Sequence, residues 1–345
     1  MPGGTAVARA PDAERASVSA IRPAPPALAA NPFHAGWAVA AATGRLVPHG
    51  AVRWLHAGGA RLPVTSARTL GRLPLPHTAG LAHDHCFAGH PDVSDAGQLA
   101  GLVAAASGPL LRLSRVPDDA PAHAALAATP GAVIVQTRTR AMLRSDLGFD
   151  EYVAAAIRGK KRKEFRRLRA RLEDEAPVTE RVFGETDDLG VWTDAFLALE
   201  AAGWKGEAGT AMAAREAERT YLALLLEGAR DAGALRLFRL DAGEQCAAMV
   251  IGLMGSDGGL YTYKIAHDPG LARYSPGVMA MLQVARHVLG SDDIVYADSC
   301  AKEGHPMIEQ LWSERRTLHD WAVPRGAAGR LVTAGLVRAG KARRP

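Results

Sequence analysis

The sequence predicts a mixed α/β fold, in which a central sheet is flanked by helices. In the first half of the chain, short apolar strands alternate with helical segments, a pattern typical of α/β proteins. In the second half, a strand and two helices precede three consecutive strands, which are followed by a helix and two more strands. The 345 residues leave room for two domains. A hydrophobic share of 48% with 22% charged residues indicates a globular chain.

Composition divides the chain into four parts. Residues 1–32 hold ten alanines and six prolines but no aromatic residue, which predicts a disordered leader. We expect an N-terminal domain over residues 33–148 and a C-terminal domain over residues 149–323. Residues 324–345 form a basic tail with six basic residues and no acidic one. Because the net charge of the whole chain is +5, the chain without this tail carries −1 and is nearly neutral.

The cysteine content and the hydropathy pattern bear on the cellular compartment. Cys86, Cys246 and Cys300 are too few and too scattered for a disulfide framework, which favours a reducing compartment. No uncharged stretch reaches the eighteen or more apolar residues that a membrane span needs. We therefore expect a cytoplasmic protein.

Local patterns predict most of the individual elements. In the first half, two strands surround the Gly58-Gly59 turn, and two further strands flank an alanine-rich helix. The expected elements there are the strands Ala51–Leu55, Ala60–Thr65, Leu110–Leu113 and Ala132–Gln136, and the helices Asp95–Ala106, with Ser94 as N-cap, and Ala120–Ala128. In the second half they are the strands Thr179–Phe183, Ala234–Leu240, Gln245–Met254, Leu260–Ala266, Ile294–Cys300 and Thr317–Val323, and the helices Asp188–Ala202, Thr210–Asp231, Pro276–Leu289 and Pro306–Trp312.

A long basic helix is predicted from Phe149 to Glu175, ending before Pro177. Between residues 158 and 171 it carries nine basic residues against one acid, Glu164. Three interpretations remain open for this helix. It is a solvated face over an apolar stripe, it contacts an anionic small ligand or a membrane surface, or it binds RNA.

The start of the predicted helix at Pro276 has the features of an anion site. Ser275 is a suitable N-cap, and Gly277 leaves the first turn without a side chain. Free amide groups at Gly277 and Val278, at the positive end of the helix dipole, favour an anion. Arg273 can add a further contact. The alternative is an ordinary Ser-Pro helix start with no ligand.

Several short motifs resemble the bacterial FemAB-like branch of the GNAT acyltransferases, which includes acetyltransferases of cellulose biosynthesis (CelD-like). The motifs are Lys160-Lys-Arg-Lys-Glu-Phe-Arg-Arg, Glu200-Ala-Ala-Gly-Trp-Lys-Gly, Gly209-Thr-Ala, Lys264-Ile-Ala, Ala272-Arg-Tyr-Ser-Pro-Gly, Asp298-Ser-Cys and Gly304-His-Pro-Met. They cover residues 158–323, and the first half resembles the branch more loosely. The resemblance implies a tandem GNAT-like fold, with a degenerate N-terminal unit and a full C-terminal GNAT domain.

The resemblance also implies a reaction. Acetyl-CoA would donate its acyl group directly to an amine acceptor, a small molecule or a sugar, in envelope or exopolysaccharide biosynthesis. The pantetheine would lie where the strand Leu260–Ala266 parts from Ile294–Cys300. The residues implied in donor binding are Lys264, Ile265, Ala266, Arg273, Tyr274, Ser275, Gly277 and Val278. The stretch from Arg273 to Val278 departs from the usual cradle, because it has one glycine and Pro276 removes an amide donor.

Catalysis requires that the amine acceptor lose a proton. Deprotonating a lysine-like amine at pH 7 costs about 4–5 kcal/mol, so a positioned base is expected. Asp298, at the end of a predicted strand, is the first candidate, Glu200 the second, and His267 with Asp268 the third. The alternative for Asp298 is a carboxylate that caps the following turn. Tyr296 or Tyr263 would protonate the departing thiolate. The acceptor pocket is expected to involve Trp204, Lys205, His267 and His305.

Two alternatives to the acetyltransferase remain. One is an aminoacyl transferase that uses charged tRNA, and the other is a nonenzymatic scaffold on a degenerate fold. One stretch, His83-x-His85-Cys86-x-x-x-His90, contains zinc-type ligands. The spacing lacks a second ligand pair, so we expect no metal and interpret the stretch as a polar loop between the two halves.

Overall fold

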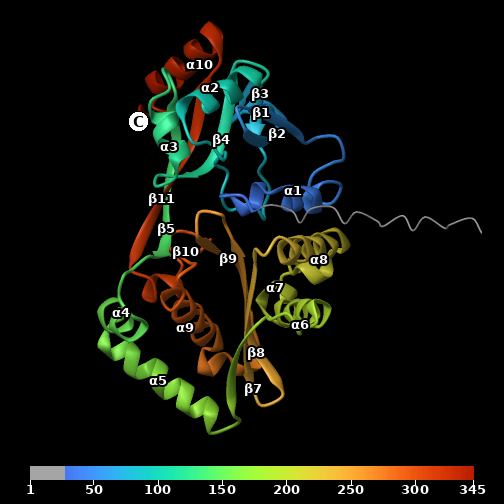
Figure 1. Cartoon of the computed structure of the whole chain (residues 1–345), viewed down its shortest axis with the longest axis vertical. Helices are drawn as coiled ribbons and strands as arrows, with labels where there is room; N and C mark the ends of the chain where they lie inside the picture. The colour runs from blue at the N-terminus through green and yellow to red at the C-terminus, as the bar shows by residue number, and fades with distance from the viewer. Residues whose placement is uncertain (1–27) are drawn as a thin grey trace, which may run out of the picture.

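The computed structural model describes residues 28–345, except for the side chains of Trp204 and Lys205. Its described strands form one sheet of eleven, in the order β1-β2-β3-β4-β11-β5-β10-β9-β8-β7-β6 (Figure 1). The strands are Arg53–Ala57 (β1), Ala60–Leu70 (β2), Leu73–Gly80 (β3), Leu110–Pro117 (β4), Val133–Leu143 (β5), Val178–Val182 (β6), Leu235–Ala242 (β7), Gln245–Met254 (β8), Gly259–His267 (β9), Tyr296–Asp298 (β10) and Glu314–Pro324 (β11).

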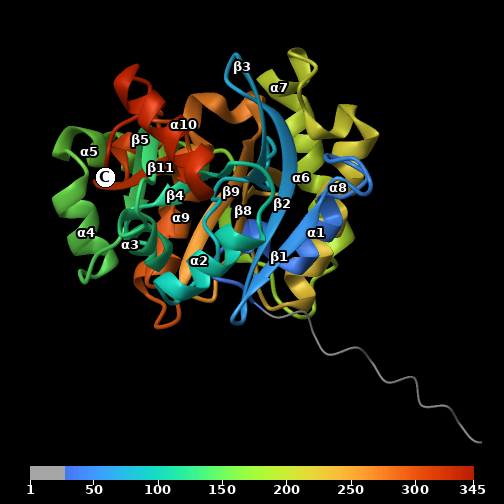
Figure 2. The same ribbon diagram turned by 90° about the horizontal axis from the view of Figure 1, so that it is seen from above.

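Helices cover both faces of the sheet. They are Gly36–Ala42 (α1), Ala96–Ala105 (α2), Pro121–Ala127 (α3), Phe149–Ala156 (α4), Gly159–Glu173 (α5), Leu189–Ala202 (α6), Trp204–Glu207 (α7), Glu216–Asp231 (α8), Pro276–Leu289 (α9) and Gly326–Arg338 (α10), with short 3-10 turns at Pro32–His34 (η1), Met212–Ala214 (η2), Pro269–Tyr274 (η3) and Ile308–Gln310 (η4). Around β7–β9, α9 and α5 lie on one side and α6 and α8 on the other (Figure 1). The view down the long axis shows the same division (Figure 2).

The sheet is mixed, as predicted. The pairs β3–β4 and β9–β10 are parallel, whereas the other neighbouring pairs are antiparallel. β11, the last strand, lies between β4 and β5, and thereby joins strands from the two halves of the chain. One apolar cluster packs around α6, α8, α9 and β7–β9, and a second packs under α2 and α3.

Several predicted elements match closely, and others need correction. The helix Pro276–Leu289 and the strand Gln245–Met254 are confirmed at both ends. The helix predicted over Asp188–Ala202 (α6) begins one residue later, at Leu189, with Asp188 as its N-cap. The helix predicted from Thr210 begins only at Glu216. The helix expected over Asp95–Ala106 is capped by Asp95 rather than Ser94, because the Asp95 carboxylate accepts the Gln98 amide at 2.8 Å.

The long basic helix is in fact two helices, α4 and α5, separated at Ile157 and Arg158. Ile157 has an extended backbone (φ −102°, ψ 125°) and is buried. The break leaves carbonyls at the end of α4 without helical partners. Arg162 satisfies two of them, because its guanidinium donates to the Ala154 carbonyl at 2.5 Å and to the Ile157 carbonyl at 2.7 Å.

Both ends of the described chain pack against the fold. Within the predicted leader, residues 28–32 are ordered, and the buried Asn31 side chain donates to the carbonyls of Ala88 and His90 at 3.0 and 3.1 Å. The rest of the leader lies outside the described residues. The predicted basic tail contains α10, which packs against β11 and buries Leu336. From residue 28 onward, no helix combines the length and apolarity that crossing a bilayer requires.

Candidate active site

The strands β9 and β10 part soon after they meet. They pair at three positions, Tyr296 with Gly259, Ala297 with Leu260, and Asp298 with Tyr261. β9 continues to His267, but β10 ends at Asp298. The predicted strand Ile294–Cys300 is therefore much shorter than expected, and β9 runs on beyond Tyr261 without strand pairing on this side.

A β-bulge in β9 lies next to the point of separation. Opposite β8, Gly252 pairs with Thr262 and Ile251 with Lys264, so that Tyr263 is the extra residue. A bulge of this kind redirects neighbouring side chains. Here the two consecutive residues Tyr263 and Lys264 both contact the layer that includes α6 and α8. Thr262 and Ile265 instead line a cavity beside α9.

The cavity occupies the gap between the parted strands. Thr262 and Ile265 of β9 and Met281 of α9 form its walls, and residues 299–308, which follow β10, cover it. Its volume of about 40 Å³ holds very few water molecules. The gap predicted between these strands is thus present, but residues 299–308 largely fill it.

The first turn of α9 adjoins this gap and differs from the predicted anion cradle. Ser275 adopts the left-handed conformation (φ 55°) and makes no side-chain cap. The Val278 amide was expected to be free, but it donates to the Ser275 carbonyl at 3.0 Å. No protein acceptor for the Gly277 amide is found in the described part of the chain. A Cβ at Gly277 would lie 3.5 Å from Met307 Sδ, which shows that this methionine lies against the turn.

Arg273 and Tyr274, both implied in donor binding, face α5 instead. The Arg273 guanidinium donates to Glu175 at 2.9 Å and lies 4.7 Å from the centre of the Tyr274 ring. The Tyr274 hydroxyl bonds to the same carboxylate. These contacts hold η3 against the end of α5.

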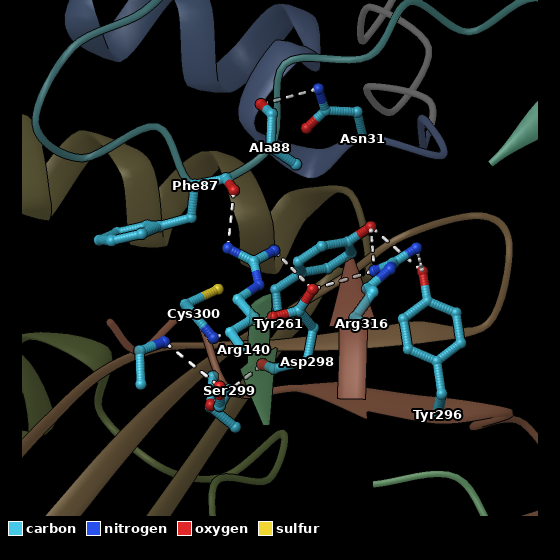
Figure 3. Close-up of polar contacts among 12 residues, drawn as sticks. Asn31, Phe87, Ala88, Arg140, Tyr261, Tyr296, Asp298, Ser299, Cys300 and Arg316 are labelled. Atoms are coloured by element: carbon cyan, nitrogen blue, oxygen red, sulfur yellow. Dashed lines mark hydrogen bonds and ion pairs between the residues drawn. The ribbon is translucent and has the colours of Figure 1, made fainter. Parts of the chain in front are cut away.

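Asp298 is the centre of a buried ionic cluster (Figure 3). Its side chain is fully buried, and Oδ2 accepts from Arg140 at 2.5 Å and from Arg316 at 3.0 Å. Its other oxygen accepts the Cys300 amide at 2.9 Å. Burial opposes ionisation of Asp298, but the two guanidinium groups outweigh it and lower the pKa of the carboxyl. A carboxylate held in this way is a weak proton acceptor, which argues against the role of base.

Tyr296 belongs to the same cluster rather than to the gap. Its hydroxyl donates to Asp257 at 2.7 Å and lies 3.1 Å from the Tyr261 hydroxyl. Burial raises the pKa of Tyr296. Tyr296 pairs with Gly259, the first of the three paired positions of β9 and β10, whereas the strands part after the last one.

Glu200, the second predicted base, lies on the other side of the bulge. It is buried near the end of α6, where Oε2 accepts the Met212 amide at 2.9 Å and Oε1 pairs with Lys264 Nζ at 3.2 Å. The structure thus brings together two predicted site residues, Glu200 and Lys264, at the parted segment of β9.

Sequence reasoning did not identify the partners of Tyr263. Its hydroxyl lies 2.9 Å from His85 Nδ1, and His85 Nε2 lies 3.8 Å from a Glu218 carboxylate oxygen on α8. Burial raises the pKa of Tyr263 well above its ordinary value, so the phenol stays protonated at neutral pH. The signal in the sequence was the polar run from His83 to His90, which we interpreted as a loop between the halves.

The remaining predicted acceptor residues lie either beside the gap or outside the described side chains. His305 lines the gap cavity, and His267 Nδ1 would lie 3.6 Å from a Cβ at Gly277. The side chains of Trp204 and Lys205 lie outside the described residues. Among residues 28–345, apart from those two side chains, no group of three or more His, Cys, Asp or Glu residues is arranged to hold a metal ion.

Comparison with known proteins was made for both sequence and fold. Residues 159–298 match the family model of the acetyltransferase (GNAT) domain. This segment extends from α5 to β10 and includes both the bulge and α9. The match supports an acyltransferase. A comparison with curated protein sequences found no match.

Similar folds occur among solved structures. FemX is 10% identical, with 84% of this chain and 90% of that chain covered and a TM-score of 0.50. A tandem GNAT protein from the clavulanic acid biosynthesis pathway is 15% identical, with 81% and 85% covered and a TM-score of 0.41. The C-terminal domain of a putative lysylphosphatidylglycerol synthetase from Agrobacterium fabrum is 11% identical, with 84% and 89% covered and a TM-score of 0.49. The likeness to FemX concerns the fold alone.

Proposed function

We propose that the protein is an N-acyltransferase that moves an acetyl group from acetyl-CoA to an amine. The observation that carries this proposal is the separation of β9 from β10 after Tyr261, at a bulge and beside the first turn of α9. A gap between parallel strands, next to a helix N-terminus, can take the extended arm and the diphosphate of such a donor.

The donor side requires a rearrangement of the segment after β10. Met307 lies against Gly277, and His305 lines the small cavity, so both side chains would move aside to admit the donor. The backbone of Lys264, Ile265 and Ala266 would then border the thioester. Arg273 would reach a phosphate only by releasing Glu175, an exposed ion pair of the kind that stabilises little.

On the acceptor side we assign Glu200 as the base, and retain Trp204, Lys205 and His267 as candidates for acceptor binding. Glu200 is the better candidate than Asp298 because it contacts the parted segment of β9 through Lys264, whereas Asp298 is bound by two arginines. An acidic group on this face also suits an acceptor that arrives as an ammonium ion.

The reaction is a direct transfer. The amine loses a proton towards Glu200, and its nitrogen bonds to the acyl carbon as the carbon–sulfur bond breaks. The leaving thiolate takes a proton, and we assign this step to the Tyr263 hydroxyl, a neutral donor on the bulge. The resemblance to the FemAB-like branch favours a cytoplasmic role in envelope or exopolysaccharide biosynthesis.

Calorimetric titration with acetyl-CoA, joined to an assay of thiol release with a panel of amines, tests this proposal. We compare Gly277→Ala with Gly277→Asp. An alanine Cβ would meet only ordinary contacts of 3.5–3.7 Å, so it should leave affinity near wild type. The aspartate carboxylate would repel a diphosphate and should weaken binding tenfold or more.

The titration also separates the alternatives. Equal affinity of wild type and Gly277→Asp would contradict a diphosphate at this turn. A chain that binds no acetyl-CoA but retains charged tRNA in a salt-sensitive manner would instead be an aminoacyl transferase. A chain that binds neither would favour the scaffold.

A further inference from the structure

A second, larger recess lies between α4, α5 and α9. Its volume is about 510 Å³, which is within the range of small-molecule sites. It is separate from the gap cavity because the two use different residues of α9. Met279, Leu282 and Arg286 line the recess, whereas Met281 lines the gap cavity. In Figures 1 and 2, α4 and α5 lie on the side of the molecule away from α6 and α8.

The floor of the recess is apolar. Val153 of α4, Phe165 of α5 and Leu282 of α9 line it, and each is only partly buried by the protein. Buried Ile157 and Met279 extend the same surface inward. Three helices thus leave hydrophobic side chains facing a common hollow, where a hydrocarbon chain would complete their burial.

The rim is rich in guanidinium groups. Two of the four arginines are paired within the protein, because Arg169 binds Glu173 and Glu180, and Arg286 binds Glu180 at 2.6 Å. The other two have no carboxylate partner among the described residues. Arg162 is directed to the carbonyls at the end of α4, and Arg166 is exposed at the opening.

The surroundings add positive charge. Arg158, Lys160, Lys163, Arg167 and Arg171 also lie on or next to α5, and no ion pair with an acid in the described part of the chain offsets them. Of the acidic residues that line the recess, Glu173 and Glu180 are paired with arginines, and Asp150 forms no ion pair with a described residue. An anion at the opening near Arg166 therefore gains both a bidentate partner and a favourable local potential.

We propose that this recess binds a single-chain amphiphile with an anionic phosphate or carboxylate head. The hydrocarbon chain lies on Val153, Phe165 and Leu282, and the head lies at Arg166. Because the site is a hollow between helices rather than an outward apolar face, its occupant is one molecule and not a bilayer surface. This inference goes beyond the proposed acyl transfer and does not depend on it.

Titration of the whole chain with dodecyl phosphate, below its micelle concentration, tests the proposal by calorimetry. Dodecyl maltoside supplies the same chain with a neutral head, and inorganic phosphate supplies the head alone. We expect dodecyl phosphate to bind at least tenfold more tightly than either. Equal binding of all three ligands, or no binding of dodecyl phosphate, overturns the proposal.

Two pairs of exposed variants locate the ligand without disturbing the core. Ala154 lines the recess and Ala155 does not, so Ala154→Trp should weaken binding at least tenfold and Ala155→Trp should not. Likewise, Arg166→Glu should weaken binding at least tenfold more than Arg167→Glu, because Arg166 lines the recess whereas Arg167 contributes only to the local potential. If both members of each pair behave alike, the ligand lies elsewhere and the proposal fails.

An experiment with vesicles distinguishes binding of a single amphiphile molecule from binding to a membrane surface. The same four variants are sedimented with vesicles that contain anionic phospholipid. If binding to vesicles depends on both Arg166 and Arg167 and ignores Ala154→Trp, while dodecyl phosphate does not bind, α5 is a membrane-surface helix and the recess is not a ligand site.

Discussion

The Arg140 guanidinium and the Asp298 carboxylate form a buried ion pair with 2.5 Å between Nη2 and Oδ2. The pair connects β5 to β10, and Arg140 also donates to the Phe87 carbonyl at 2.9 Å (Figure 3). Phe87 lies in the same loop as His85, whose Nδ1 contacts the Tyr263 hydroxyl. Asp298 thereby ties together the end of β10, the neighbouring strand and a loop from the N-terminal half, directly where β9 and β10 part.

We predict that Asp298→Asn destabilises the protein by about 3–5 kcal/mol, because it leaves the buried Arg140 guanidinium without a carboxylate and removes one of the two carboxylates that bind Arg316. Asp119→Asn is the control, since Asp119 also binds Arg316, at 2.8 Å, but is 25% exposed. Urea denaturation measures both variants. A folded Asp298→Asn protein of normal stability that had lost all activity would restore Asp298 as the base.

Glu200→Gln should lower kcat by about 100-fold or more, as expected for loss of a general base. The acid limb of the pH–rate profile should disappear with it. Glu216→Gln, an exposed change on α8, is the control and should behave as wild type. An unchanged acid limb in Glu200→Gln would remove this residue from catalysis, even if kcat fell.

Tyr263→Phe should lower kcat more than it raises KM for the donor, because the change removes the proton donor on the bulge. Loss of its hydrogen bond to His85 should cost only about 1 kcal/mol of stability. Tyr261→Phe provides the matched control, since the Tyr261 hydroxyl contacts Tyr296 at the paired end of β9 and β10. Equal kinetic effects of the two variants would argue against a special role for Tyr263.

Stability should fall as the pH drops from 7 to 5. Burial lowers the pKa of His34 to about 4 and that of His90 to about 3, whereas both titrate near 6.5 when unfolded. Between these values the unfolded chain binds more protons, so acid favours unfolding, by about 2 kcal/mol per histidine over this interval. Burial also lowers the pKa of His83 to about 4, so at least three histidines contribute. In urea titrations, His34→Gln should therefore reduce the pH slope by about a third or less. A slope unaffected by this change would mean that other groups control it.

The sequence predicted local elements better than their assembly. The Gly58-Gly59 hairpin follows from turn chemistry, and the helix from Pro276 begins where a proline at the first helical position predicts, although Ser275 does not cap it. The strand β11 was expected at Thr317–Val323, but its insertion between β4 and β5 was not, because pairing across the chain leaves no local periodicity. The break at Ile157 was missed because Val153, Ile157 and Phe165 keep helical spacing across it.

The site was predicted only in outline. The separated strands were expected from the resemblance and the helix start from the residues 275–277, and both are present. The roles within the site could not be read from residue types, since Asp298 acquires its partners from Arg140 and Arg316, 158 and 18 positions away. Tyr263 depends in the same way on His85, 178 positions away.

The most direct test of the account is hydrogen exchange with and without saturating acetyl-CoA. If the donor lies between the parted strands, amides of residues 262–267 and 276–279 should become protected. Residues 301–308 should also change their exchange as Met307 leaves Gly277. Binding with no change in these three segments, or with protection confined to other parts of the chain, would contradict the account.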